Sequence, residues 1–197
     1  MDFEEFINTT YQYDTFDIVD TNTNGTCCYD SILKLLKLNK KIKLNMNTKI
    51  IQTQAVNWII KNKNLYLPEF GLTIEDFVLF THNLDSFQEY IDTYKIYSGK
   101  NDYSITNNRW GGTPELIALS NIYNININVY TGNSYDKNKN KIIKGTIIYN
   151  KPRKDFRFKL LLNTNNDFKK NDENSFNILY TRYKNNSSHF DALLKKK

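Results

Sequence analysis

The spacing of apolar residues predicts helices through much of the first two-thirds of the chain. Within residues 48–62, apolar side chains such as Ile51 and Ile59 recur every three or four positions, as they do on one face of a helix. Thr113 followed by Pro114 is typical of a helix start, with Thr113 as the cap. Helices are therefore expected at residues 28–38, 48–62, 73–80, 84–97 and 113–123.

The period then changes to that of β-strands. Residues 125–129 alternate strictly between Ile or Val and Asn, which predicts a strand. Further strands are expected at residues 142–149, 156–162, 176–183 and 188–194, with loops at 131–141 and 163–174. No internal repeat or domain boundary interrupts this order. Residues 1–197 are thus expected to form one α+β domain, with helices packed around a mostly antiparallel sheet.

The composition favours a folded protein of the cytoplasm. With 197 residues, of which 40% are hydrophobic, the chain can bury a sizeable core. No apolar run approaches about 18 residues, and the acidic segment at residues 1–5 lacks the features of a signal peptide. The two cysteines are adjacent, so a disulfide framework is excluded. We expect a reducing, cytoplasmic setting and no membrane partner.

The net charge of +6 raises the question of nucleic-acid binding. Lysines are interleaved with Asn and Ile along the chain, as in residues 137–141. This distribution is more typical of an A+T-rich coding bias than of one basic face, so nucleic acid is not an expected partner.

The two adjacent cysteines are candidates for a nucleophile. On a helix, Cys28 falls on the apolar stripe, whereas Cys27 points in the direction of Ser31 and Lys34. Cys27 also lies at the helix N-terminus, where free N–H groups and the helix dipole stabilise a thiolate. Gly25 permits the tight turn that this placement needs. The alternative is that both cysteines are small core residues, which is common for free cysteine.

A base for such a nucleophile is available near the end of the chain. His189 and Asp191 are two residues apart on a predicted strand, so their side chains share one face. Asp191 can then accept the ring N–H of His189 and leave the other nitrogen for the thiol. His82 is the other histidine, and its helix-end context offers no carboxylate on the same face. Taken alone, His189 is better explained as an ordinary surface histidine.

Three segments in order resemble the ovarian tumour (OTU) domain cysteine proteases. Asn-Gly-Thr-Cys-Cys-Tyr-Asp-Ser at residues 24–31 is similar to that family's Asp-Gly-Asn-Cys signature. Trp-Gly-Gly-Thr-Pro-Glu-Leu-Ile-Ala-Leu-Ser at residues 110–120, followed by a strand, resembles its Trp-Gly-Gly segment. His-Phe-Asp at residues 189–191 resembles its terminal His-aromatic-Asp/Asn element. The resemblance spans roughly residues 20–195.

The resemblance implies a papain-like cysteine protease fold that cleaves after the Gly-Gly terminus of ubiquitin or a ubiquitin-like modifier. It assigns the nucleophile Cys27, the base His189 and the orienting acid Asp191; the oxyanion turn of Asn24, Gly25 and Thr26; and the tail channel of Trp110, Gly111 and Gly112. The expected partner is the modifier with its conjugates. No cofactor and no metal are expected, and the protein is expected to be a monomer.

Two departures from the family pattern concern the turn before Cys27. Asn24 stands where the family usually has Asp, and Thr26 stands where it has Asn. Asn24 cannot carry the charge of Asp, which leaves open an OTU-like ubiquitin-binding module with weak or no turnover. A third hypothesis keeps the chemistry but changes the substrate, as in a viral protease that cuts its own polyprotein. An active deubiquitinase is the leading hypothesis, because nucleophile, base and orienting acid are all present.

Overall fold

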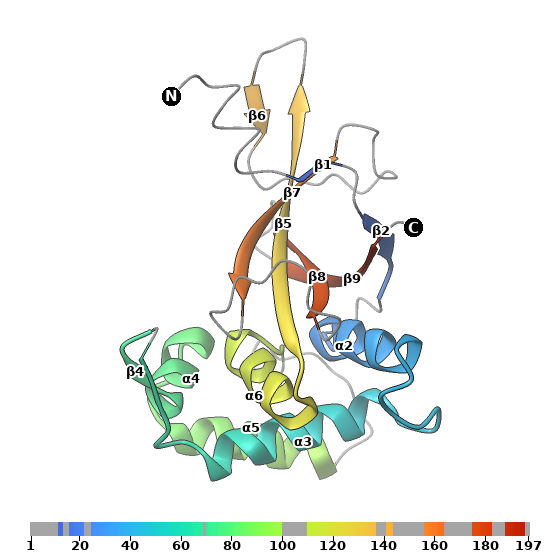
Figure 1. Ribbon diagram of the computed structural model, residues 1–197. Helices are drawn as coiled ribbons and strands as arrows, with labels where there is room; N and C mark the ends of the chain where they lie inside the picture. The colour runs from blue at the N-terminus through green and yellow to red at the C-terminus, as the bar shows by residue number, and fades with distance from the viewer. Residues whose placement is uncertain are drawn as a thin grey trace.

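The structure has a layer of helices at one end of a twisted β-sheet (Figure 1). It is a computed structural model that describes residues 12–13, 16–21, 25–68, 70–99, 110–136, 141–143, 156–163, 175–182 and 188–195. The helices gather at the bottom of Figure 1, and the long strands rise from them. This arrangement is the α+β architecture that the sequence predicts.

The described helices match the predicted ones, with small shifts at their ends. They are α2 (Cys27–Leu38), α3 (Thr48–Lys61), α4 (Ile74–His82), α5 (Phe87–Gly99) and α6 (Thr113–Tyr123). The prediction that Thr113 caps α6 is wrong, because the cap is Gly112. The N–H of Gly112 donates to Glu115 Oε2 at 2.7 Å, so this side chain folds back over the start of the helix.

The main sheet is mostly antiparallel, as predicted. Its strands are β1 (Gln12–Tyr13), β2 (Phe16–Val19), β5 (Asn126–Asp136), β6 (Lys141–Ile143), β7 (Phe156–Asn163), β8 (Ser175–Arg182) and β9 (Ser188–Lys195). They follow the order β1-β7-β5-β8-β9-β2, and β6 pairs with β5. Only β5 and β8 run parallel among the described strands. A separate hairpin joins β3 (Tyr66–Leu67) to β4 (Leu72–Thr73).

The largest difference from the prediction is the length of β5. The strand continues to Asp136, so the expected loop 131–141 is wrong for residues 131–136, while residues 137–140 lie outside the described residues. Its polar second half is held by pairing with β7 and β6, contacts that a local pattern does not contain. Strand β2 was not predicted, because four residues are too few to establish a period. Most of the expected strand 142–149 and most of the expected loop 163–174 lie outside the described residues.

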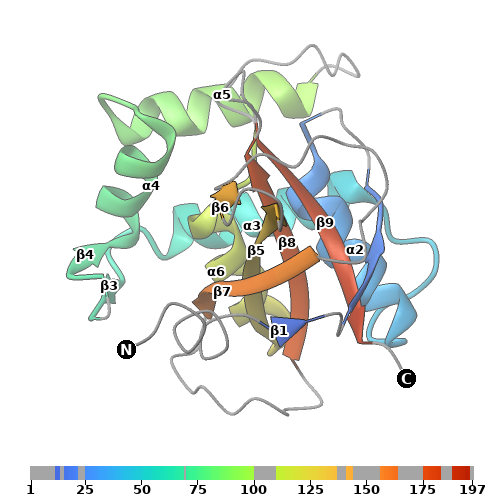
Figure 2. The same cartoon turned by 90° about the horizontal axis from the view of Figure 1, so that it is seen from above.

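The core lies between the helices and the sheet. Fully buried residues on three elements, Ile32 on α2, Leu119 on α6 and Ile178 on β8, belong to one apolar cluster. Strand β9 pairs with β8 along one edge and with β2 along the other, and helix α2 packs against it (Figure 2). The start of α2 is therefore brought to the strand that carries His189.

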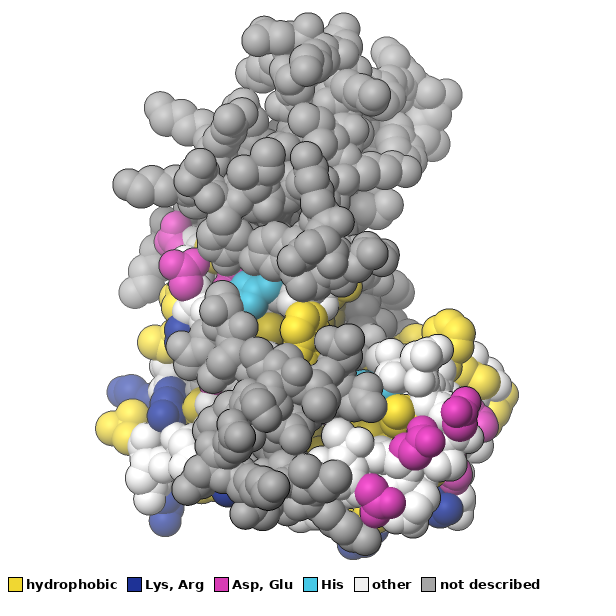
Figure 3. All heavy atoms as spheres, turned by 180° about the vertical axis from the view of Figure 1, so that it is seen from behind, with side chains coloured by type: hydrophobic (Ala, Val, Ile, Leu, Met, Phe, Trp, Pro, Cys, Tyr) yellow, Lys and Arg dark blue, Asp and Glu magenta, His cyan; other side chains and the backbone are white. Residues whose placement is uncertain are grey.

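The surface of the helical layer carries separated charges. In the lower part of Figure 3, most basic side chains lie on the left and most acidic side chains lie on the right.

Among the described residues, no helix combines the length and the apolar character needed to cross a membrane.

Candidate active site

The candidate nucleophile lies in the first turn of α2. Gly25 has a φ of 85°, a left-handed conformation that glycine adopts without steric cost. The chain then passes through Thr26 into Cys27, the first residue of the helix. The N–H groups of a first helical turn have no partners within the helix, so they favour negative charge beside them. Cys27 thus lies beside the backbone N–H groups that begin α2.

The two cysteines differ less in exposure than the helical phase predicts. Cys28 is fully buried, and burial together with the nearby charge of Cys27 raises the pKa of its thiol well above the ordinary value. Cys27 is also only 5% exposed, and Ser31 on its side of the helix is buried. The expected polar face is wrong, because β9 packs against α2. Contact with His189, rather than exposure, sets Cys27 apart.

His189 lies between Cys27 and Asp191. Its Nε2 donates to Asp191 Oδ1 at 3.0 Å, which leaves Nδ1 for the thiol. Burial lowers the pKa of His189, but hydrogen bonds to Asp191 and Cys27 and the charges of both groups raise it to about 9. The structure thus brings together the three residues that the sequence assigns to one unit, and His189 is a buried histidine rather than a surface one.

Thr21 also contacts His189 and Asp191, and the sequence does not predict this contact. Its backbone N–H donates to Asp191 Oδ1 at 2.9 Å, and its hydroxyl donates to the Phe190 carbonyl at 2.5 Å. The hydroxyl also lies 3.3 Å from His189 Nε2. Thr21 is the second residue after the end of β2 at Val19. The pairing of β2 with β9 brings it next to His189 and Asp191. No local signal marks it, because the contact joins opposite ends of the chain.

The turn before Cys27 is held by a hydrogen bond to Asp30, a residue of α2. Thr26 Oγ1 donates to Asp30 Oδ2 at 2.9 Å, and Thr48 Oγ1 of α3 donates to the other oxygen of Asp30. Asp30 is buried, and its two carboxylate oxygens connect the turn to α3. Asn24, which the sequence places in the oxyanion turn with Gly25 and Thr26, lies outside the described residues.

The segment Trp110–Gly112 packs against the first turn of α2, next to the candidate nucleophile. A Cβ added to Gly111 would lie 2.9 Å from the ring of Tyr29 and 3.0 Å from Cys28 Cβ, so only glycine fits there. A Cβ added to Gly112 would lie 3.0 Å from the methyl group of Thr81. These contacts fix the segment between α2 and α4.

His82 has a carboxylate partner that the sequence analysis did not foresee. Its Nε2 lies 2.9 Å from Glu115 Oε1, which also accepts the hydroxyl of Tyr90 at 2.9 Å. Burial lowers the pKa of His82, but the charge and hydrogen bond of Glu115 raise it above its ordinary value. Glu115 is itself fully buried and, because it also binds Gly112 N–H, connects α4, α5 and the Trp110–Gly112 segment. His82 is therefore engaged away from Cys27.

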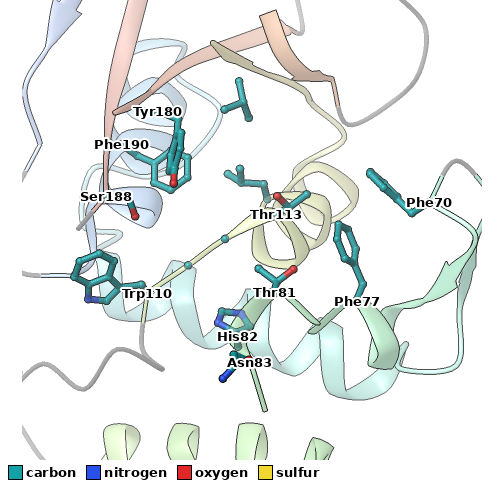
Figure 4. A pocket seen from close by; sticks show the side chains of 14 residues that line it. Phe70, Phe77, Thr81, His82, Asn83, Trp110, Thr113, Tyr180, Ser188 and Phe190 are labelled. Atoms are coloured by element: carbon teal, nitrogen blue, oxygen red, sulfur yellow. The ribbon is translucent and has the colours of Figure 1, made fainter. Parts of the chain in front are cut away.

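A cavity of about 570 Å³ opens beside these residues (Figure 4). Trp110 and the two glycines form one wall, and Ser188 and Phe190, which flank His189, form another. Its remaining lining is largely apolar and includes Phe77, Val129 and Tyr180. Trp110 Nε1 is buried and has no hydrogen-bond partner in the part of the chain described. Such buried donors are rare in proteins unless a ligand or water satisfies them.

Comparisons with known proteins place this geometry in context. A family model described as OTU-like cysteine protease matches residues 22–164. A comparison with curated protein sequences finds no match. Among solved structures, the Hazara virus OTU bound to ubiquitin has 17% identity and a TM-score of 0.49, covering 95% of this chain and 87% of the other. An OTU deubiquitinase from Wolbachia pipientis wMel has 17% identity and a TM-score of 0.48, covering 93% and 91%.

Proposed function

Because the chain belongs to the OTU-like cysteine protease family, we propose that it is a thiol-dependent deubiquitinase. In this proposal Cys27 is the nucleophile, His189 is the general base and Asp191 orients the His189 ring. The observation that carries it is the position of His189, which contacts Cys27 and Asp191 at once. The choice of ubiquitin rests on the resemblance of the three sequence motifs to those of deubiquitinases in this family.

The proposed reaction begins from the ion pair in which His189, whose pKa is about 9, already holds the proton of the Cys27 thiol. The thiolate attacks the carbonyl carbon of the terminal glycine, and the oxygen of the tetrahedral intermediate becomes negative. In this proposal, backbone N–H groups at the start of α2 stabilise that charge. The C–N bond then breaks as His189 returns the proton to the leaving amine. Water, deprotonated by His189, hydrolyses the thioester and regenerates the thiol.

The cavity beside Trp110 is the proposed site for the modifier's C-terminal tail. Gly111 and Gly112 form part of its wall, and a tail that ends in Gly-Gly has no side chains to keep it from approaching their backbone closely. Its apolar lining suits the residues that precede those glycines.

A ubiquitin probe with a C-terminal thiol-reactive group tests the proposal. We expect labelling of the wild type, loss of labelling in Cys27→Ala, and retained labelling in Cys28→Ala. The second variant is a matched control, because it removes the adjacent thiol from the same helix. Labelling that persists in Cys27→Ala would contradict the assignment. Tight binding of unmodified ubiquitin without any labelling would instead support the alternative of a binding module.

A further inference from the structure

Charge is unevenly distributed along the helical part of the chain. Residues 31–68 contain lysines at 34, 37, 40, 41, 43, 49, 61 and 63, and they contain no Arg, Asp or Glu. The next segment, residues 69–92, contains acids at 69, 75, 76, 85, 89 and 92, and it contains no Lys or Arg. The reading of the lysines as evenly scattered is wrong for this part of the chain. Its two segments carry strong and opposite charge.

The basic charge is densest where α2 turns into α3. We call residues 37–50 the basic turn, and its lysines are Lys37, Lys40, Lys41, Lys43 and Lys49. The same turn exposes large aliphatic side chains between those lysines. Leu44 is 82% exposed, Leu38 is 57% exposed and Ile50 is 39% exposed. Lysines that alternate with exposed aliphatic residues are typical of surfaces that bind the membrane interface.

One lysine of the basic turn occupies a backbone position that favours glycine. Lys40 has a φ of 54°, just after the end of α2. Its N–H donates to the Lys37 carbonyl at 3.0 Å, and the next N–H, of Lys41, donates to Leu36 at 2.9 Å. This pair of bonds is the Schellman ending of a helix, whose left-handed residue is usually glycine. The chain thus keeps a charged side chain where glycine would be less strained.

The basic turn lies far from the proposed reaction centre. It follows the C-terminal end of α2, whereas Cys27 begins the same helix, which has 12 residues and a length of about 18 Å. In Figure 1 the link from α2 to α3 lies at the right edge, and α4 with β4 lies at the left edge. Figure 3, seen from behind, shows the corresponding basic side on the left and acidic side on the right. A surface that attracts the basic turn would therefore repel the acidic end and leave the cavity free.

Contrary to the expectation of no membrane partner, we propose that the basic turn docks the protein on an anionic phospholipid surface. The lysines are attracted to acidic headgroups, and Leu38, Leu44 and Ile50 enter the interfacial region. Nucleic acid is the less suitable occupant, because the turn has no arginine for bidentate contacts and no aromatic ring for stacking on bases. The docking is peripheral and independent of the proposed peptidase reaction.

Sedimentation with lipid vesicles tests this proposal on the full chain. We expect binding to phosphatidylcholine vesicles that contain about 30% phosphatidylserine, little binding to phosphatidylcholine alone, and weaker binding as salt is raised. Lys40→Gly should lower the partition coefficient about fivefold, the usual contribution of one basic residue. Its melting temperature should stay the same or rise, because glycine relieves the left-handed backbone. Loss of binding is then not a result of unfolding.

A second pair of variants tests the apolar part of the contact. Leu44→Ser should weaken vesicle binding on the order of fivefold, whereas Leu65→Ser, at another exposed leucine outside the basic turn, should leave it unchanged. No binding to the acidic vesicles, or equal binding to neutral vesicles, would overturn the proposal. Binding that neither Lys40→Gly nor Leu44→Ser reduces would also overturn it. So would a salt-sensitive complex with a duplex oligonucleotide in the absence of vesicle binding.

Discussion

Replacing Glu115 by Gln removes a carboxylate that is buried among three donors. Its oxygens accept from His82 and Tyr90 at 2.9 Å each and from the Gly112 N–H at 2.7 Å. Gln keeps the shape, but it has one carbonyl oxygen for these donors and no charge for His82. Breaking a buried ion pair by removing one partner costs about 3–5 kcal/mol. Because Gln retains part of the hydrogen bonding, we expect a loss near the lower end, about 3 kcal/mol, at pH 6.

The loss should depend on pH in a defined direction. The pKa of His82 is raised above 6.5 in the folded state, so its contribution to stability is complete below pH 6.5 and disappears as the pH rises through the folded value. The pKa of Glu115 is lowered below 4.5, so its contribution is present above pH 4.5 and disappears as the pH falls through the folded value. The difference between Glu115→Gln and wild type should thus be largest between pH 4.5 and 6.5.

Urea unfolding at several pH values measures this difference, provided that the transition is two-state. Glu75→Gln is the matched control, because Glu75 pairs with Lys63 at 3.3 Å on a partly exposed surface. Pairs of that kind contribute less than about 1 kcal/mol. A loss in Glu115→Gln no greater than in the control, or one that is constant from pH 5 to 9, would refute the proposed ion pair.

Further predictions concern the candidate active site. His189→Ala should lower kcat by several orders of magnitude in a ubiquitin-substrate assay. Wild-type activity should decline as the pH passes about 9, the pKa of His189. A pH profile that stays flat to pH 10 would contradict the second expectation. Thr21→Val keeps the backbone N–H bond to Asp191 but loses the hydroxyl, so kcat should fall about tenfold with little change in KM. Thr21→Ser keeps the hydroxyl and should have a kcat close to that of the wild type. Gly111→Ala should lower the melting temperature as well as the activity, because the new methyl group meets Tyr29; an unchanged melting temperature would count against that packing.

The members of the candidate site that sequence could predict share a local signal. Gly25 and Cys27 are read from a turn that starts a helix, and His189 with Asp191 are read from the two-residue period of a strand. Thr21 has no such signal, because its role depends on the pairing of β2 with β9, 170 positions from Thr21 to Asp191 along the chain. A sequence pattern specifies which face a residue takes, but not which distant segment covers it.

The same limit explains the errors about burial and partners. Helical phase correctly placed Cys28 in the core, but the burial of Cys27 comes from β9, which the phase of α2 cannot report. Likewise, His82 was judged by its neighbours in sequence, while its partner Glu115 is 33 positions away. Glu115 belongs to the Trp-Gly-Gly segment at residues 110–120, but its burial depends on contacts with α4 and α5 that this segment does not contain.

The location of β9 between β8 and β2 has a consequence for the order of synthesis. His189 lies on this strand, and Thr21, 168 positions earlier, meets it only after β9 has paired with β2. Closing so long a loop is slow compared with forming the local helices. In the proposed mechanism, a ribosome-bound chain that lacks β9 therefore carries the Cys27 thiol but not the base assigned to deprotonate it. We therefore expect the newly made protein to stay inactive until this strand has left the ribosome.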